Sequence, residues 1–130
     1  MLIEINTTSQ SPIYEQLRDQ IVLGMAAGQL TPGEKLPSVR RLGVDIGINY
    51  HTVNKAYTML CEEGYIVLDT RKRAAVSPMM KCTGDFQARL SQKLLLIAAE
   101  AICHGISKEE FTKTCSKYYQ KAMEGQTNGH

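Results

Sequence analysis

Apolar residues recur every three or four positions along the first half of the chain, which predicts three helices. The first helix is expected to begin at Ser11-Pro12, with Ser11 as the N-cap and Pro12 in the first helical position. Gly28 is placed to end it in the left-handed conformation. The buried stripe of this helix is predicted to consist of Ile13, Tyr14, Leu17, Ile21, Gly24 and Met25.

The second and third helices are predicted to follow each other closely. Ser38 is the expected N-cap of a short second helix, whose inward residues are Val39, Leu42 and Ile46. Gly47 closes that helix, Ile48 folds back on its last turn, and Asn49 caps a third helix that ends near Gly64. Because only three residues separate the two helices, the pattern predicts a helix-turn-helix.

The third helix has two contrasting faces. Val53, Ala56, Tyr57, Leu60 and Cys61 form its apolar stripe. The opposite face contains no acid before Glu62 and is composed of Tyr50, His51, Thr52, Asn54, Lys55 and Thr58. A carboxylate on a recognition helix would be repelled by phosphate, whereas these side chains can bond to bases or phosphates. We therefore expect this face to lie against DNA in the major groove.

The segment "YIVLDTRKRAAVSP", residues 65–78, predicts two strands joined by a tight basic turn. Such a hairpin would form a wing beside the third helix. Its turn carries Arg71, Lys72 and Arg73, and a second basic group consists of Arg40, Arg41 and Lys55. The two groups could face one polyanion, although a run of basic residues is also typical of ordinary solvated surface.

The C-terminal third of the chain is apolar on most sides of its helices. Residues 86–102 have hardly any polar face, and Ser107 with Glu110 forms a capping box that opens a final helix with Phe111, Cys115, Tyr118 and Ala122 on one stripe. Two helices cannot bury that much apolar surface between themselves, so we expect an αα-hairpin that pairs with a second copy. The alternative is packing on the chain's own N-terminal domain. The expected dimerisation residues are Phe86, Leu90, Leu94, Ile97, Ala101, Phe111 and Tyr118.

Composition and motifs exclude several classes of function. The chain of 130 residues is 43% apolar, enough for a core, and its net charge of +2 indicates little about partners. Its densest apolar stretch, 94–102, is far shorter than the roughly 20 residues that cross a bilayer, and no signal peptide is recognised, so we expect a cytoplasmic protein. The four cysteines form no C-x-x-C pair and are expected to be free and buried, with no metal. No enzyme motif occurs, and no cofactor is expected.

The stretch "GQLTPGEKLPSVRRLGVDIGINYHTVNKAYTMLCEEGYI" resembles the winged-helix domain of GntR-family bacterial transcription regulators. The resemblance covers residues 11–77 and rests on the Leu-Pro-Ser sequence before the second helix, Arg40, the T-V-x-x-A-Y core of the third helix and the pair Glu63-Gly64. The remaining fifty or so residues are similar in length to the short helical C-terminus of the YtrA-type branch, which is frequently associated with ABC-transporter operons.

This resemblance implies roles for particular residues. It makes Arg40 a phosphate or base contact, and it makes Asn49, Tyr50, Thr52 and Asn54 the contacts of the recognition helix. Asn49 could equally serve only as a helix cap. Two departures are visible: the family often has Pro or Arg at the position of Tyr50, and its spaced wing glycines are missing from "DTRKRAAV". The complete predicted interface is Ser38, Arg40, Arg41, Asn49, Tyr50, His51, Thr52, Asn54, Lys55, Arg71, Lys72 and Arg73.

The expected fold is mainly α with a small β-hairpin. Residues 1–78 would form a winged helix-turn-helix DNA-binding domain, residues 79–124 a helical dimerisation region, and residues 125–130 a disordered tail. The expected function is a sequence-specific transcription regulator, a repressor that binds a palindromic operator in double-stranded DNA as a homodimer, with an unidentified effector and no membrane association. The alternative is a winged-helix module that binds protein.

Overall fold

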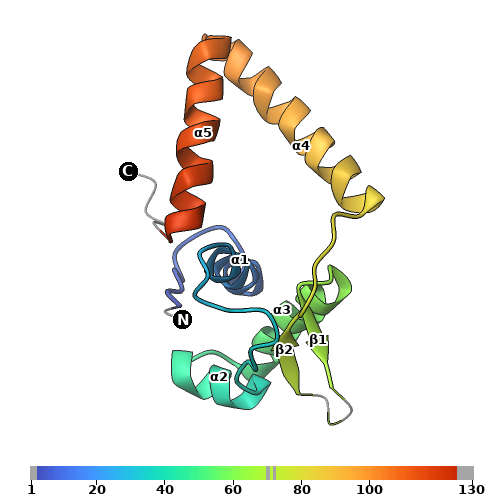
Figure 1. The fold of residues 1–130 in the computed structure, drawn as a ribbon. Coiled ribbons are helices and arrows are strands. Elements are labelled where there is room, and N and C mark those ends of the chain that lie inside the picture. The colour runs from blue at the N-terminus through green and yellow to red at the C-terminus, as the bar shows by residue number, and fades with distance from the viewer. Residues whose placement is uncertain (1–2, 70, 72, 126–130) are drawn as a thin grey trace. The chain divides into compact units, whose positions relative to one another are not determined.

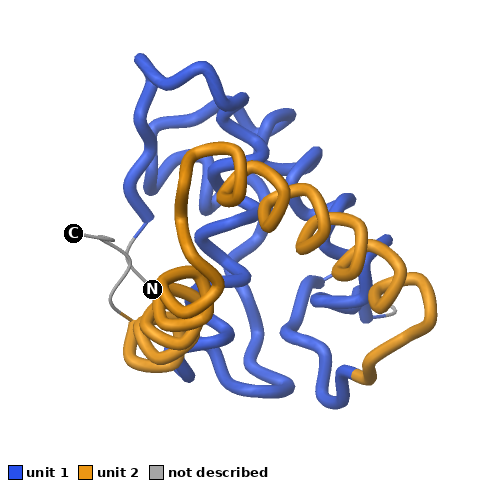
Figure 2. The backbone as a smooth tube through the Cα atoms, turned by 90° about the horizontal axis from the view of Figure 1, so that it is seen from above, with its two compact units in different colours: residues 1–80 blue, residues 81–130 orange. Residues whose placement is uncertain are grey.

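The computed structural model describes residues 3–69, 71 and 73–125 of the chain, which divides into two compact units (Figures 1 and 2). Lys72 and all of the expected disordered tail except Gly125 lie outside the described residues. The first unit, residues 1–80, contains α1 (Ile13–Ala26), α2 (Val39–Ile46), α3 (Tyr50–Glu62), β1 (Ile66–Leu68) and β2 (Ala74–Val76). The second unit, residues 81–130, contains α4 (Gly84–Cys103) and α5 (Lys108–Glu124). The predicted mainly α architecture with one β-hairpin is confirmed.

The core of the first unit lies where α1 and α2 pack against α3. Leu17 and Ile21 of α1 meet the apolar stripe of α3 and are fully buried, and the burial of each stabilises the fold by about 1.5–3 kcal/mol. The predicted stripes are therefore confirmed, with Ile13, Tyr14 and Met25 half-buried at the edge. The buried residues of the core are Leu17, Ile21, Leu30, Leu36, Leu42, Val53, Ala56, Tyr57, Leu60, Ile66, Ala74 and Val76.

The predicted start of α1 is wrong by one residue. The helix begins at Ile13, Pro12 occupies the N-cap position, and no side chain caps the helix. Pro12 has an extended backbone (φ −55°, ψ 147°), and its carbonyl accepts hydrogen bonds from the amides of Glu15 and Gln16, each at 3.1 Å. The Ser11 amide instead donates to Ser9 Oγ at 3.1 Å, so Ser11 belongs to the preceding turn. The C-terminal prediction is confirmed, because Gly28 has a φ of 76°.

Side chains cap both helices of the helix-turn-helix as predicted. Ser38 Oγ accepts a hydrogen bond from the amide of Arg41 at 3.1 Å at the start of α2. Asn49 Oδ1 accepts one from the amide of His51 at 2.8 Å at the start of α3. Each cap satisfies an amide that has no partner within its helix, which defines where the two helices begin.

The turn between α2 and α3 depends on two glycines. Gly47 has a φ of 71°, which permits the Ile48 amide to donate to the carbonyl of Gly43 at 2.8 Å. A Cβ on Gly43 would lie only 2.8 Å from the carbonyl oxygen of Ile48. The absence of a side chain at Gly43 therefore allows the close approach between α2 and the turn that leads into α3.

The wing is a two-stranded antiparallel sheet in which Ile66 pairs with Val76 and Leu68 pairs with Ala74. The segment before α2 also bonds to β2: the Leu36 amide donates to the Ala74 carbonyl at 2.9 Å, and the Val76 amide donates to the carbonyl of Glu34 at 2.8 Å. Because this segment continues into α2, these hydrogen bonds connect the wing to the helix-turn-helix.

In the second unit, α4 and α5 diverge from their short connection (Figure 1). The Ile106 amide donates to the carbonyl of Ala101 at 2.9 Å, and Gly105 adopts a φ of 78°. Ser107 caps α5 as predicted, with its Oγ accepting from the Glu110 amide at 3.1 Å. Most of the large apolar residues of α4 are exposed in the single chain, and the structure finds no buried residue in α5.

Candidate nucleic-acid interface

The polar face of α3 points to solvent. His51, Asn54, Lys55 and Thr58 are exposed, and Tyr50 at the start of the helix is 37% exposed. Thr52 is half-buried. Because the buried stripe of α3 occupies the other side, these polar groups are held outward by the packing of the core, on a rigid helix.

A groove of about 610 Å³ lies between the start of α2, the middle of α3 and the wing. Its lining is mostly apolar, with Leu36, Tyr57 and Ala74 among the residues, while Glu62 is its one acid among the described residues. The groove brings together five of the predicted DNA contacts, namely Ser38, Arg40, Asn54, Arg71 and Arg73. Lys35, which the sequence analysis did not single out, adds a further cation. A concave surface with several cations suits a polyanion.

Tyr57 holds the segment before α2 against α3. Its hydroxyl donates to the carbonyl of Pro37 at 2.8 Å, and only 4% of the residue is exposed. Burial raises the pKa of the Tyr57 phenol above its usual range, so the hydroxyl remains a donor into the alkaline range. The prediction that Tyr57 belongs to the core is confirmed.

Arg40 and Tyr50 meet across the two helices of the motif. The Arg40 Cζ atom lies 4.3 Å from the centroid of the Tyr50 ring. The ring of His51 lies beside that of Tyr50, with centroids 4.1 Å apart and planes inclined by 32°. Within the part of the chain that the structure describes, no acid pairs with Arg40, so its N–H groups are available to an anion.

The other predicted cations of the helices have different surroundings. Arg41 Nε lies 3.3 Å from Asp45 Oδ1, one turn further along α2, in an exposed ion pair. Lys55 Nζ lies 4.0 Å from the centroid of the Tyr14 ring on α1. Arg41 therefore has a carboxylate as its neighbour, which partly offsets its attraction for phosphate, whereas the neighbour of Lys55 is an aromatic ring.

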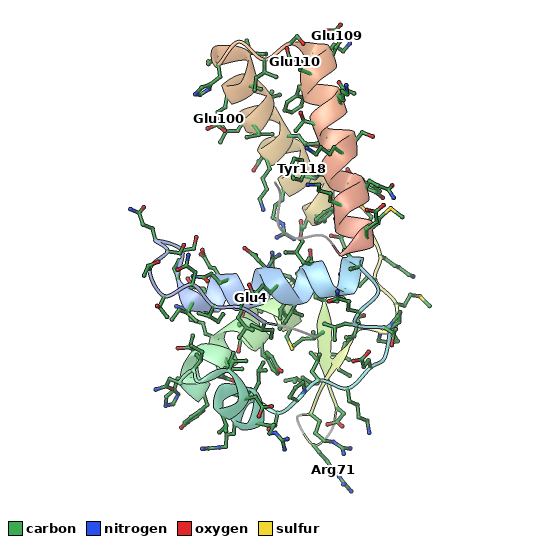
Figure 3. The ribbon with its side chains drawn as sticks, turned by 90° about the vertical axis from the view of Figure 1, so that its left-hand side faces the viewer. Glu4, Arg71, Glu100, Glu109, Glu110 and Tyr118 are labelled. Carbon is green, nitrogen blue, oxygen red and sulfur yellow. The ribbon has the colours of Figure 1, made fainter. Side chains whose placement is uncertain are left out.

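Asp69 organises the wing turn. Its Oδ1 accepts from the amides of Arg71 (2.9 Å) and Arg73 (2.8 Å), and its Oδ2 accepts from Arg73 Nε at 2.8 Å. These hydrogen bonds hold the pKa of the Asp69 carboxyl below its usual value. The Arg71 side chain extends away from the unit at the tip of the wing (Figure 3). The sequence analysis overlooked Asp69, although an Asp two residues before a turn amide is a known turn signal.

The predicted dimerisation residues lie on α4 and α5. Ala101 is buried and Phe111 is half-buried, whereas the others remain between 38% and 49% exposed in the single chain, namely Phe86, Leu90, Leu94, Ile97 and Tyr118. Burial within the single chain thus covers only part of the expected apolar surface.

The burial of the cysteine thiols differs from the prediction. All four cysteines are free as predicted, but only Cys61 is half-buried, and Cys82, Cys103 and Cys115 are exposed. The prediction of buried thiols is therefore wrong for three positions: Cys82 lies in the exposed segment before α4, and the faces of α4 and α5 that carry Cys103 and Cys115 are uncovered in the single chain. Within the described residues, no three potential metal ligands of the His, Cys, Asp or Glu type form a group. No described helix is long and apolar enough for a membrane span.

Comparisons with known proteins were made for sequence and for structure. The family model "Bacterial regulatory proteins, gntR family" matches residues 10–76. The HTH-type transcriptional repressor YtrA of Bacillus subtilis is 46% identical over 65 residues, which is 50% of each protein. The HTH-type transcriptional regulator Rv1152 of Mycobacterium tuberculosis is 37% identical over 71 residues, 55% of this chain and 57% of that protein. The matched region thus spans about half the length of these relatives.

Solved structures extend the similarity. A transcriptional antiterminator from Listeria monocytogenes EGD-e superposes with a TM-score of 0.87 at 30% identity, covering 95% of this chain and 93% of that one. YtrA from Sulfolobus acidocaldarius, described as a GntR-family transcription factor, gives a TM-score of 0.65 at 39% identity, covering 78% and 99%. These proteins are named as regulators of transcription rather than enzymes. The chain therefore belongs to the GntR family of bacterial regulatory proteins, and its helix-turn-helix resembles that of YtrA-type members.

Proposed function

We propose that this protein is a sequence-specific DNA-binding transcription regulator that represses its target genes as a homodimer on a palindromic operator. The observation that carries the proposal is the surface formed by the acid-free face of α3, the basic groove and the wing, in a chain that belongs to this family. DNA binding gains support from the fold of the AraR DNA-binding domain in complex with its operator, which is similar at a TM-score of 0.52 and 22% identity.

Different residues of this surface would contact bases and phosphates. α3 would enter the major groove with its N-terminal turns, so that Asn54 could reach a base edge, while Arg40 at the start of α2 would contact phosphate. The caps at Ser38 and Asn49 use their side-chain oxygens within the protein. We therefore expect the Ser38 hydroxyl and the Asn49 side-chain amide to donate hydrogen bonds to DNA, while their oxygens continue to cap the helices.

The exposed apolar residues of the second unit support the homodimer. Leu94, Leu95 and Ile97 of α4 are 47%, 74% and 49% exposed in the single chain. The two helices of this unit diverge from their connection (Figure 1). A contiguous apolar surface of this kind marks an interaction site. A second copy of the same hairpin is the simplest complementary surface, and a two-fold dimer presents two copies of α3 to half-sites about 34 Å apart.

Repression is supported by the name of the B. subtilis relative, a transcriptional repressor. Control of an ABC-transporter operon rests on the family resemblance alone. A regulator with these contacts would act on the chromosome, so we expect it in the cytoplasm.

The test is selection of bound fragments from the genome of the source organism, followed by titration of a selected and a scrambled duplex at several salt concentrations. We expect a preferred sequence with two-fold symmetry and a steep linear fall of log affinity with log salt. Sedimentation should give a dimer at the concentrations used. A chain that binds no duplex at low salt would instead favour the protein-binding module.

A further inference from the structure

The contact between Arg40 and Tyr50 distinguishes this arginine from Arg41 and Arg73, the two arginines of the interface that pair with acids. Arg41 Nε is 3.3 Å from Asp45 Oδ1, and Arg73 Nε is 2.8 Å from Asp69 Oδ2. Arg40 has no such acid among the described residues and instead lies with Cζ 4.3 Å from the Tyr50 ring centroid. Its neighbour is thus a ring that competes for none of its hydrogen bonds.

A guanidinium over an aromatic face interacts through its planar surface. The N–H groups lie in the plane of the guanidinium and remain free to form a two-pronged bond with a phosphate or a guanine. The ring also restricts the Arg40 side chain in the free protein, so that less rotamer entropy is lost when Arg40 binds DNA. A contact of this kind with the ring face would order Arg40 before DNA arrives without using its donors.

The ring itself is well placed for this task. Tyr50 is the first residue of α3, directly after the capping residue Asn49, so its backbone is held by the helix start. His51 provides a second neighbour, with its ring centroid 4.1 Å from that of Tyr50. The position is also close to the α2–α3 turn, because a Cβ on Gly43 would lie 3.4 Å from Tyr50 Cα.

We propose that Tyr50 is a positioning residue for DNA binding, whose ring holds the Arg40 guanidinium in the orientation in which it bonds to DNA. The proposal rests on the proposed DNA-binding function and adds to it the route by which Tyr50 acts. Tyr50 works through its aromatic face and through Arg40, not through a hydroxyl bonded to phosphate. A phenylalanine at position 50 should therefore preserve DNA binding, whereas a leucine should weaken it.

The experiment measures the affinity of the full-length chain for a fluorescein-labelled random-sequence duplex at low salt. We expect Tyr50→Leu to weaken binding about fivefold, because it loses one exposed cation–π contact and the ordering of Arg40 that this contact provides. Tyr50→Phe retains the ring and should bind within about twofold of wild type. In an Arg40→Ala background, Tyr50→Leu should have almost no further effect. In an Arg41→Ala background, the matched control, its effect should be undiminished.

A second measurement reports on the free protein. The Cδ protons of Arg40 should be shifted upfield by the ring current in the NMR spectrum of wild type and of Tyr50→Phe, and should return to ordinary values in Tyr50→Leu. Three results would overturn this inference but leave the proposed function standing. They are equal losses of affinity in the Phe and Leu variants, additive effects of Tyr50→Leu and Arg40→Ala, and unshifted Arg40 protons in wild type. A wild-type chain that binds no duplex would overturn the proposed function and this inference with it.

Discussion

Arg18 on α1 and Glu63 at the end of α3 form a two-pronged ion pair. Arg18 Nε lies 2.9 Å from Glu63 Oε1, and Arg18 Nη2 lies 3.0 Å from Glu63 Oε2, with both side chains about one-fifth exposed. The hydrogen bond to Glu63 is the main reason that the pKa of Arg18 is raised above its ordinary range. Arg18 Cζ also lies 5.3 Å from the centroid of the Tyr65 ring. The pair connects the end of α3 to α1.

Replacing Glu63 should therefore destabilise the first unit. We expect Glu63→Gln to lower the free energy of unfolding by about 1–2 kcal/mol, because a partly buried guanidinium loses a charged hydrogen-bonding partner. Asp45→Asn, which breaks the exposed pair with Arg41, is the matched control and should cost less than about 0.5 kcal/mol. Urea unfolding followed by circular dichroism measures both changes. Equal losses in the two variants would show that the Arg18–Glu63 pair stabilises the fold no more than an exposed ion pair does.

Tyr57 should make stability depend on alkaline pH. Its pKa in the folded protein is raised above the ordinary value of 10.0, so its contribution is fully present below about pH 10 and is lost as the pH rises further, where the unfolded chain releases the proton more readily. Tyr57→Phe should lose about 1 kcal/mol at neutral pH with the hydrogen bond to Pro37, and should show a shallower alkaline decline.

The control for that comparison is Tyr119→Phe, because Tyr119 is 73% exposed. This variant should follow the wild-type stability at every pH. An identical alkaline decline in wild type and Tyr57→Phe would mean that another group is responsible.

The two described arginines of the wing should differ in their effect on DNA binding. Arg71 extends from the tip (Figure 3), whereas Arg73 pairs with Asp69. We expect Arg71→Ala to weaken binding to any duplex and to reduce the slope of log affinity against log salt by about one unit. Arg73→Ala should reduce the slope by less, because its charge is already partly neutralised. Titration at four salt concentrations distinguishes them, and the reverse order would contradict this assignment.

A charge on the apolar surface of α4 should disrupt assembly without unfolding the first unit. We expect Leu94→Glu to raise the dimer dissociation constant at least tenfold, because a buried unpaired carboxylate costs more than about 1.4 kcal/mol. Gln92→Glu adds the same charge to the same helix and serves as control. Sedimentation equilibrium gives the result. A Leu94→Glu chain that dimerises as well as Gln92→Glu would place the interface elsewhere.

The helices and the wing could be predicted because their signals are local. Ser38, Gly47 and Asn49 define element ends through their own side chains or backbone freedom, and the stripe on α3 needs only a period of 3.6 residues. The one-residue error at Pro12 has the same origin. A proline fits both the cap and the first helical position, and only the hydrogen bonds around it distinguish the two.

The contacts between elements could not be predicted. Nothing in sequence spacing indicates that Arg40 lies over Tyr50, because that contact depends on the angle between α2 and α3. The pair of Arg41 with Asp45 differs, because it lies within α2 at the i,i+4 spacing. The ion pair of Arg18 with Glu63 joins residues 45 positions apart. The exposure of Cys103 and Cys115 was also missed, because burial in α4 and α5 depends on what covers these helices and not on their composition.

Asn54→Ala tests the central claim, that the exposed face of α3 reads DNA sequence, most directly. The measurement is the affinity of the wild-type and variant chains for a selected operator and for a scrambled duplex of the same length and composition, each at several salt concentrations. We expect the variant to lose about 1–3 kcal/mol on the operator only, with an unchanged salt slope, because Asn54 would lose its hydrogen bonds to a base edge. An equal loss on both duplexes, or no loss on either, would contradict the placement of α3 in the major groove.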